Sequence, residues 1–97
     1  MKTVMITYDQ AHHDGVVDAL RSSLCRGYTI ISQVGGCGSK SGEPHLGTHA
    51  WPSMNEAVIT VCPDERVQPL LDRLRKLDVE NPLLGLRAFV WNCEEGI

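Results

Sequence analysis

The spacing of apolar residues along the chain predicts strands and helices in alternation. Runs rich in β-branched residues predict strands over residues 3–8, 28–34, 56–62 and 86–91. Apolar residues at helical spacing predict one helix over about residues 11–24 and another from residue 63 to the turn at Asn81-Pro82. We expect the buried stripes of the two helices to be Val16, Val17, Leu20 and Leu24, and Val67, Leu70, Leu71, Leu74 and Leu77.

Two finer features of these helices also follow from residue type. Gly27 is expected to end the first helix, because glycine readily adopts the left-handed conformation at a helix C-terminus. Asp72 lies four residues before Lys76, so we expect these two side chains to pair on the exposed side of the second helix.

The order strand–helix–strand–strand–helix–strand predicts an α+β domain of the ferredoxin-like (βαββαβ) type. In this fold a four-stranded antiparallel sheet carries both helices on one face, and residues 1–97 suffice for one such domain. The strands nevertheless place apolar residues on both of their sides, as at Ile30 and Ile31, Val58 and Ile59, and Phe89 and Val90. An uncovered apolar sheet face favours self-association, so we expect a homo-oligomer.

A long connection over residues 35–55 separates the second and third strands. It begins with Gly35, Gly36, Gly38 and Gly42, and later contains Pro44, Gly47 and Pro52. Connections of this length in a small domain are commonly functional. The glycines allow two interpretations: a hinge at the base of the loop, or a backbone that approaches a phosphate closely.

Charge and composition exclude several classes of partner. The net charge is −3 and the basic residues form no block, which disfavours nucleic-acid binding. No segment is long and apolar enough to span a membrane, and the N-terminal apolar stretch is too short for a signal peptide. The cysteines have no spacing typical of a disulfide framework, so we expect a cytoplasmic protein without membrane insertion.

Candidate chemistry is concentrated in the long connection. Cys37, His45 and His49 carry the donor atoms that a divalent metal prefers, although solvated histidines are the commoner outcome for such a loop. His12 and His13 are expected to be solvated, because adjacent helical residues point in different directions. No nucleophile elbow or acid–base pair is evident, so we expect a binding protein and not an enzyme. Arg87 is the cation expected near an anionic ligand, or else an ordinary sheet-edge residue.

One stretch resembles the PII signalling proteins. Arg26-Gly27-Tyr28-Thr29 leads into Val34-x-Gly36-x-Gly38-x-x-x-Gly42, which is similar to the root of the PII T-loop. The resemblance implies a trimer that takes adenine nucleotides in clefts between subunits and signals through the T-loop. It also implies that Gly36 and Gly38 lie beside that cleft. Arg87, on a strand similar to the one after the PII B-loop, would face the phosphates.

The chain also departs from the PII pattern. The loop is shorter than a standard T-loop, and residues 78–85 are acidic and apolar where the B-loop is rich in glycine and arginine. The segment 42–52 resembles a divergent PII-like branch associated with heavy-metal efflux transporters. That resemblance implies a membrane transporter as partner, and we expect Leu46 and Trp51 to contact it unless they cap the subunit's own core. The alternative is a CutA-like protein that binds a divalent metal through Cys37, His45 and His49.

Overall fold

The computed structural model describes residues 1–36 and 54–97. The strands are β1 (Lys2–Asp9), β2 (Tyr28–Val34), β3 (Asn55–Cys62) and β4 (Arg87–Asn92). The α-helices are α1 (His13–Ser22) and α2 (Val67–Glu80), and three short 3₁₀ helices are η1 (Gln10–His12), η2 (Asp64–Arg66) and η3 (Pro82–Leu84). The predicted order of strands and helices is therefore confirmed.

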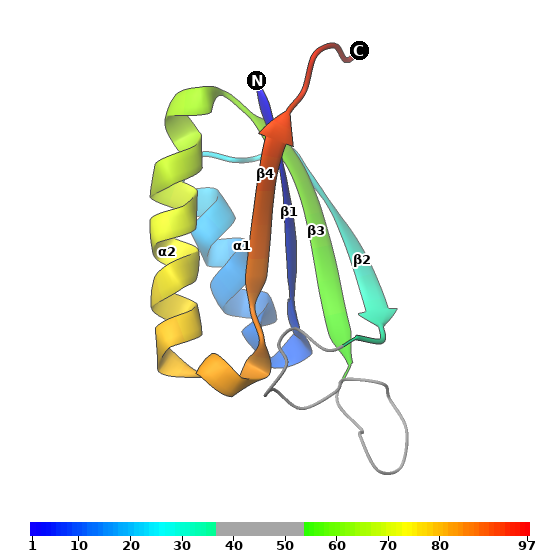
Figure 1. Ribbon diagram of the computed structural model, residues 1–97, viewed down its shortest axis with the longest axis vertical. Helices are drawn as coiled ribbons and strands as arrows, with labels where there is room; N and C mark the ends of the chain where they lie inside the picture. The colour runs from blue at the N-terminus through cyan, green and yellow to red at the C-terminus, as the bar shows by residue number, and fades with distance from the viewer. Residues whose placement is uncertain (37–53) are drawn as a thin grey trace.

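The strands form one antiparallel sheet in the order β2-β3-β1-β4. Both helices lie on the same side of this sheet (Figure 1), which confirms the predicted fold class. Ile6 on the central strand β1 pairs with Val58 on β3 and with Ala88 on β4. This register fixes which residues of β1, β3 and β4 face the helices, because side chains alternate between the two faces.

The core fills the space between the sheet and the helices. Its fully buried members include Val4, Ile6, Tyr8, Val16, Leu20, Val58, Leu70 and Leu74. Leu71 and Leu77 are partly buried against this cluster, so the predicted stripe of α2 is confirmed. Burial of a leucine such as Leu70 contributes about 2 kcal/mol, so the two stripes hold the helices on the sheet.

The C-terminal end of α1 differs from the prediction. The helix ends at Ser22, and Leu24 adopts the left-handed conformation at φ 60° with its side chain 47% exposed. The amides of Leu24 and Cys25 donate to the carbonyls of Arg21 (3.0 Å) and Leu20 (2.9 Å), the pattern of a Schellman motif. Leu24, and not Gly27, therefore ends the helix, and it leaves the buried stripe because the chain has already turned.

The sheet face opposite the helices is uncovered and apolar. We call it the open sheet face. Met5 pairs with Ile59 and Phe89 in one row across it, and Thr3 pairs with Val61 and Trp91 in the next. Phe89 is 56% exposed and Trp91 49% exposed, and Ile31, Ile59 and Val61 are exposed as well. The predicted apolar face is confirmed, and in this single chain nothing in the described residues covers it.

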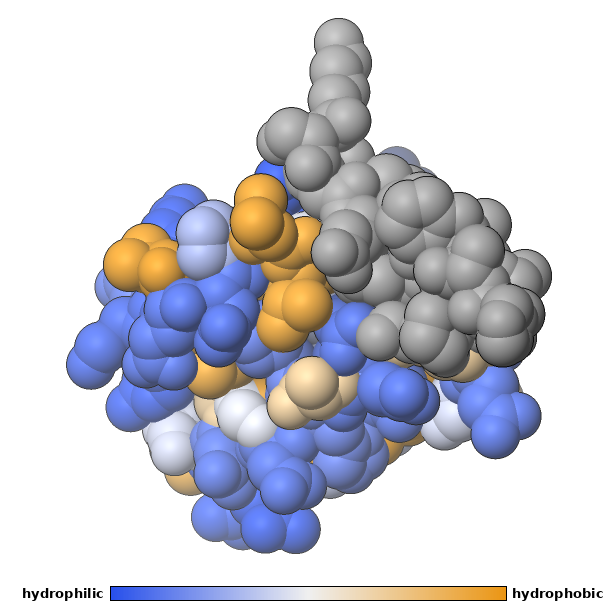
Figure 2. All heavy atoms as spheres, turned by 90° about the horizontal axis from the view of Figure 1, so that it is seen from below, coloured by the Kyte–Doolittle hydropathy of each residue, from blue (hydrophilic) through white to orange (hydrophobic). Residues whose placement is uncertain are grey.

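The end of the molecule where β1 and β2 finish and β3 begins has a different surface. The described residues make this end mainly hydrophilic, with apolar side chains in small separate groups (Figure 2). The exposed apolar residues of the strands lie on the open sheet face instead. No helix within residues 1–36 and 54–97 is long and apolar enough to cross a membrane.

Candidate functional site

Two of the predicted ligand-binding residues lie within the described chain. Gly36 follows β2 and Arg87 begins β4, and both lie at the same end of the sheet. They stand at opposite edges, however, because β3 and β1 separate β2 from β4. Three strand spacings amount to about 14 Å, so one chain does not bring Gly36 and Arg87 together.

The remaining predicted site residues lie outside the described residues. These are Gly38 of the ligand-binding set, the metal candidates Cys37, His45 and His49, and the partner-binding candidates Leu46 and Trp51. Within residues 1–36 and 54–97, no group of three or more His, Cys, Asp or Glu side chains is placed to hold a metal ion.

A cavity of about 400 Å³ lies between α2 and β4 at Arg87. Its lining combines apolar side chains with three charged ones: Leu71, Leu74, Leu86 and Ala88, and Arg75, Asp78 and Arg87. The volume is within the range of small-molecule sites, and a combination of apolar side chains with a few charged groups is typical of them. This cavity is the candidate ligand-binding site.

The backbone that leads into β4 sets the position of Arg87. After α2, the turn η3 ends at Gly85, which adopts the left-handed conformation at φ 71°. The amide of Gly85 donates to the carbonyl of Pro82 at 3.4 Å, and the next residue, Leu86, is buried in the core. With Leu86 anchored, Arg87 begins the strand at the mouth of the cavity.

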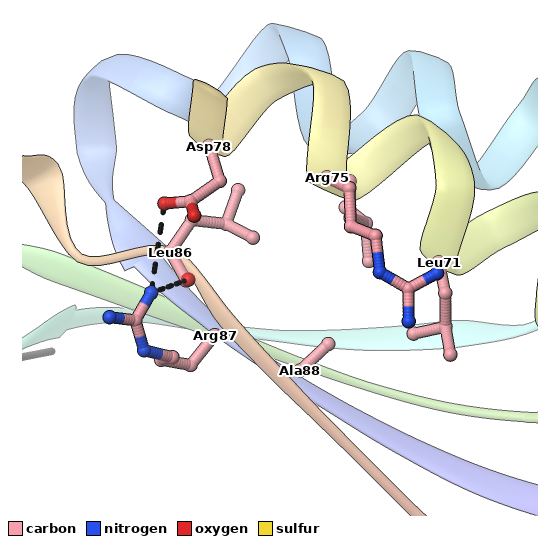
Figure 3. Close-up of a pocket in the computed structure, with 7 residues that line it drawn as sticks. Leu71, Arg75, Asp78, Leu86, Arg87 and Ala88 are labelled. Atoms are coloured by element: carbon pink, nitrogen blue, oxygen red, sulfur yellow. Dashed lines mark hydrogen bonds and ion pairs between the residues drawn. The ribbon is translucent and has the colours of Figure 1, made fainter. Parts of the chain in front are cut away.

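The guanidinium of Arg87 is held by one hydrogen bond and one ion pair. Its Nη1 donates to the carbonyl oxygen of Leu86 at 2.6 Å and lies 3.6 Å from Oδ1 of Asp78 (Figure 3). Asp78 comes from α2 and Arg87 from β4, so this ion pair spans the cavity from helix to sheet. The side chains of Arg87 and Asp78 are 40% and 33% exposed, so a ligand that enters the cavity can reach them.

Arg75 adds a second cation to the cavity wall. Its Nη1 pairs with Oδ1 of Asp72 at 3.1 Å, three residues earlier on α2. The expected pairing of Asp72 with Lys76 is therefore wrong: Asp72 faces Arg75 at the i,i+3 spacing, which is also a neighbour on a helix. Each cavity arginine already has a carboxylate beside it.

A second polar cluster joins β1, α1 and β3. The hydroxyl of Tyr8 donates to Oε1 of Glu56 at 3.0 Å, and Nδ1 of His13 lies 2.7 Å from the same oxygen. Burial, followed by the hydrogen bond with Glu56, raises the pKa of Tyr8 above its usual range. The hydrogen bond with Glu56 likewise raises the pKa of His13.

The expectation that the adjacent histidines are solvated is wrong for His12, which is buried. The side chain of His13 is 43% exposed and also pairs with Glu56 on β3. The periodicity of one helix cannot show that its N-terminus faces the first residues of β3. The sequence signal for this cluster is the cross-strand pair of Tyr8 and Glu56, which becomes visible only once the register is known.

Asp78 is the site residue that sequence reasoning did not single out. The acidic character of residues 78–85 was evident, but the pairing of Asp78 with Arg87 depends on how α2 lies over the edge of the sheet.

Among the cysteines, burial raises the pKa of Cys25 to about 11, so its thiol stays protonated near neutral pH. This buried thiol is a core residue and not a nucleophile.

A protein-family profile matches nearly the whole chain. The sequence profile of the family described as nitrogen regulatory protein P-II matches residues 1–94. No curated protein sequence matches the chain.

Solved structures of PII-like proteins share the fold. CPII from Thiomonas intermedia, bound to ADP and bicarbonate, is 27% identical, with a TM-score of 0.73 over 93% of this chain and 82% of that one. The same protein bound to ADP, AMP and bicarbonate gives 24% identity and a TM-score of 0.74 over 93% and 82% of the two chains. A PII-like signalling protein from Thermus thermophilus is 23% identical, with a TM-score of 0.67 over 95% and 85%.

Proposed function

The chain belongs to the nitrogen regulatory protein P-II family, and from this premise we propose that it is a regulatory protein that binds an adenine nucleotide. One observation carries the proposal: CPII, at 27% identity, is bound to ADP and bicarbonate. The cavity between α2 and β4 supports it, because its leucines suit the face of a base and its arginines suit a phosphate.

The proposed assembly is a homotrimer, as is typical of this family. Two features of the chain support an oligomer. The open sheet face exposes Phe89 and Trp91, and Gly36 and Arg87 stand at opposite edges of one sheet. Neighbouring copies would bury the open sheet face. They would also bring Gly36 of one subunit close to Arg87 of another, in a cleft between the two.

The proposed output is a change in residues 35–55. The ligand would favour one conformation of this connection, and a partner protein would bind that conformation more tightly. We expect a membrane transporter as partner, of the heavy-metal efflux kind that segment 42–52 resembles, contacted through Leu46 and Trp51. The role is regulatory and needs no catalytic step.

A thermal-shift series tests the ligand class. The purified chain is melted with AMP, ADP, ATP, bicarbonate or Zn²⁺, each with and without a chelator. A ligand that binds only the folded state raises Tm in step with the logarithm of its saturation. We expect a rise with adenine nucleotides that survives the chelator. A rise with Zn²⁺ alone, abolished by the chelator, would refute the nucleotide proposal.

A further inference from the structure

Asp78 occupies a place in α2 where a carboxylate does not help the helix. It lies in the last turn, which contains no basic residue. The C-terminal end of a helix carries partial negative charge, so an acidic side chain there is unfavourable. Helix stability therefore does not explain Asp78.

The surroundings of the Asp78 carboxylate do not explain it as a structural group either. Its Oδ1 is buried and has no hydrogen-bond donor within reach among the described residues. The nearest charged group is Nη1 of Arg87 at 3.6 Å, which is an ion-pair distance but too long for a good hydrogen bond. Buried carboxylate oxygens in settled structural roles are normally hydrogen-bonded. Within the part of the chain that the structure describes, the charge of Arg87 is what balances the Asp78 carboxylate.

A phosphate that enters the cavity would need the same charge. Arg87 is the cation at the cavity mouth, and Asp78 already neutralises it (Figure 3). Arg75, the other cation of the lining, is paired with Asp72. An anionic ligand would therefore compete with Asp78 for the guanidinium and would also be repelled by the carboxylate. Both costs grow with the number of charges on the ligand.

We propose that Asp78 is a specificity-determining residue that limits how much negative charge a ligand of this cavity can carry. The proposal rests on the proposed nucleotide function, which it deepens. Asp78 weakens the binding of every phosphate ligand at Arg87, and it weakens a triphosphate more than a monophosphate. The cavity thereby discriminates among AMP, ADP and ATP by charge.

The test compares the three nucleotides on matched variants at one fixed ionic strength. Isothermal titration measures Kd for AMP, ADP and ATP on the full chain, on Asp78→Asn and on Asp78→Ala. Two neutral variants are used so that a folding defect in one leaves the other informative. Asp18→Asn is the control, because it makes the same charge change on α1, where Asp18 lines a separate groove between the helices.

We expect both Asp78 variants to bind more tightly than the wild type, by roughly twofold for AMP and rising to roughly tenfold for ATP. Asp18→Asn should leave the three affinities within about twofold of the wild type. A merely structural Asp78 would change all three affinities by the same factor or leave them unchanged, and either result would overturn the proposal.

The outcomes separate this inference from the function on which it rests. If the wild type binds nucleotide and Arg87→Ala loses it, but the Asp78 variants show no graded gain, the inference alone fails. If neither the wild type nor the Asp78 variants bind any nucleotide, the nucleotide function fails and the role of Asp78 fails with it.

Discussion

Single residues account for three local features of this chain: the end of α1, the contact between α1 and β3, and the ion pair at the cavity. Leu24 holds the left-handed conformation that normally falls to glycine at the end of a helix. His13 is tied to Glu56 across the start of β3. Asp78 and Arg87 join α2 to the sheet edge. Substitution of Leu24 and of His13 each gives a testable prediction about the stability of the protein.

Replacing Leu24 with glycine should stabilise the protein. A left-handed leucine costs about 1–2 kcal/mol, part of which is offset by the greater chain entropy of glycine when unfolded. We expect Leu24→Gly to raise the free energy of unfolding by about 0.5–1 kcal/mol in urea denaturation. Leu24→Ala is the control, because alanine keeps the strain; a gain as large with alanine as with glycine would contradict the explanation.

The pair of His13 and Glu56 should make stability depend on pH. The folded state raises the pKa of His13, so the stabilisation is present below the unfolded value of about 6.5 and is lost as pH rises through the folded value. The ring is 43% exposed, so the effect should stay below about 1 kcal/mol. His13→Gln should flatten the loss of stability as pH rises above about 6.5, measured by urea denaturation. An unchanged pH profile in the variant would exclude this pair as its source.

At the scale of elements, the turn between α2 and β4 connects the core to the candidate site. Gly85 adopts a positive φ, Leu86 is buried and Arg87 begins the strand. The conformation of this turn therefore sets where the Arg87 guanidinium lies relative to Asp78.

Changing this glycine should affect both stability and binding. Gly85→Ala forces a side chain into the left-handed region, which should cost about 1 kcal/mol in the free energy of unfolding and weaken ADP binding by displacing Arg87. Gly96→Ala is the matched control, because a Cβ at Gly96 would meet no atom within 4 Å. Equal melting temperatures for the two variants would show that the turn tolerates a side chain.

Element positions could be predicted from the sequence because they follow from local patterns. The range of β2 agrees residue for residue, and the stripe of α2 is buried as expected. The predicted end of α1 was wrong because apolar spacing continues to Leu24 after the backbone has turned. The pairs Asp78–Arg87 and His13–Glu56 were missed because they join different elements, and only the packing of helix on sheet brings them together.

At the scale of the whole molecule, the open sheet face and the separation of Gly36 from Arg87 both favour an assembly of several copies of the chain. The apolar rows that contain Phe89 and Trp91 remain exposed in one chain. Gly36 and Arg87 stand at opposite sheet edges. An assembly of copies would resolve both features at once.

An acidic residue on the open sheet face should break this assembly. Phe89→Asp places a charge on the edge strand β4, at one end of the apolar row, so light scattering after size exclusion should give the mass of one chain where the wild type gives three. Val79→Asp is the control, because Val79 is 78% exposed on α2, on the other side of the sheet. A trimer in both variants, or a monomeric wild type, would contradict the role of this face.

The central claim is that the chain binds an adenine nucleotide at Arg87, and isothermal titration with ADP tests it most directly. The variants are Arg87→Ala and Arg73→Ala, which remove the same charge, Arg73 lying in the groove between the two helices and not in the cavity. We expect the wild type and Arg73→Ala to bind ADP with similar Kd, and Arg87→Ala to bind at least about tenfold more weakly, as the loss of a charged hydrogen bond to phosphate requires. ADP binding that is equal in all three proteins, or absent from the wild type, would contradict this claim.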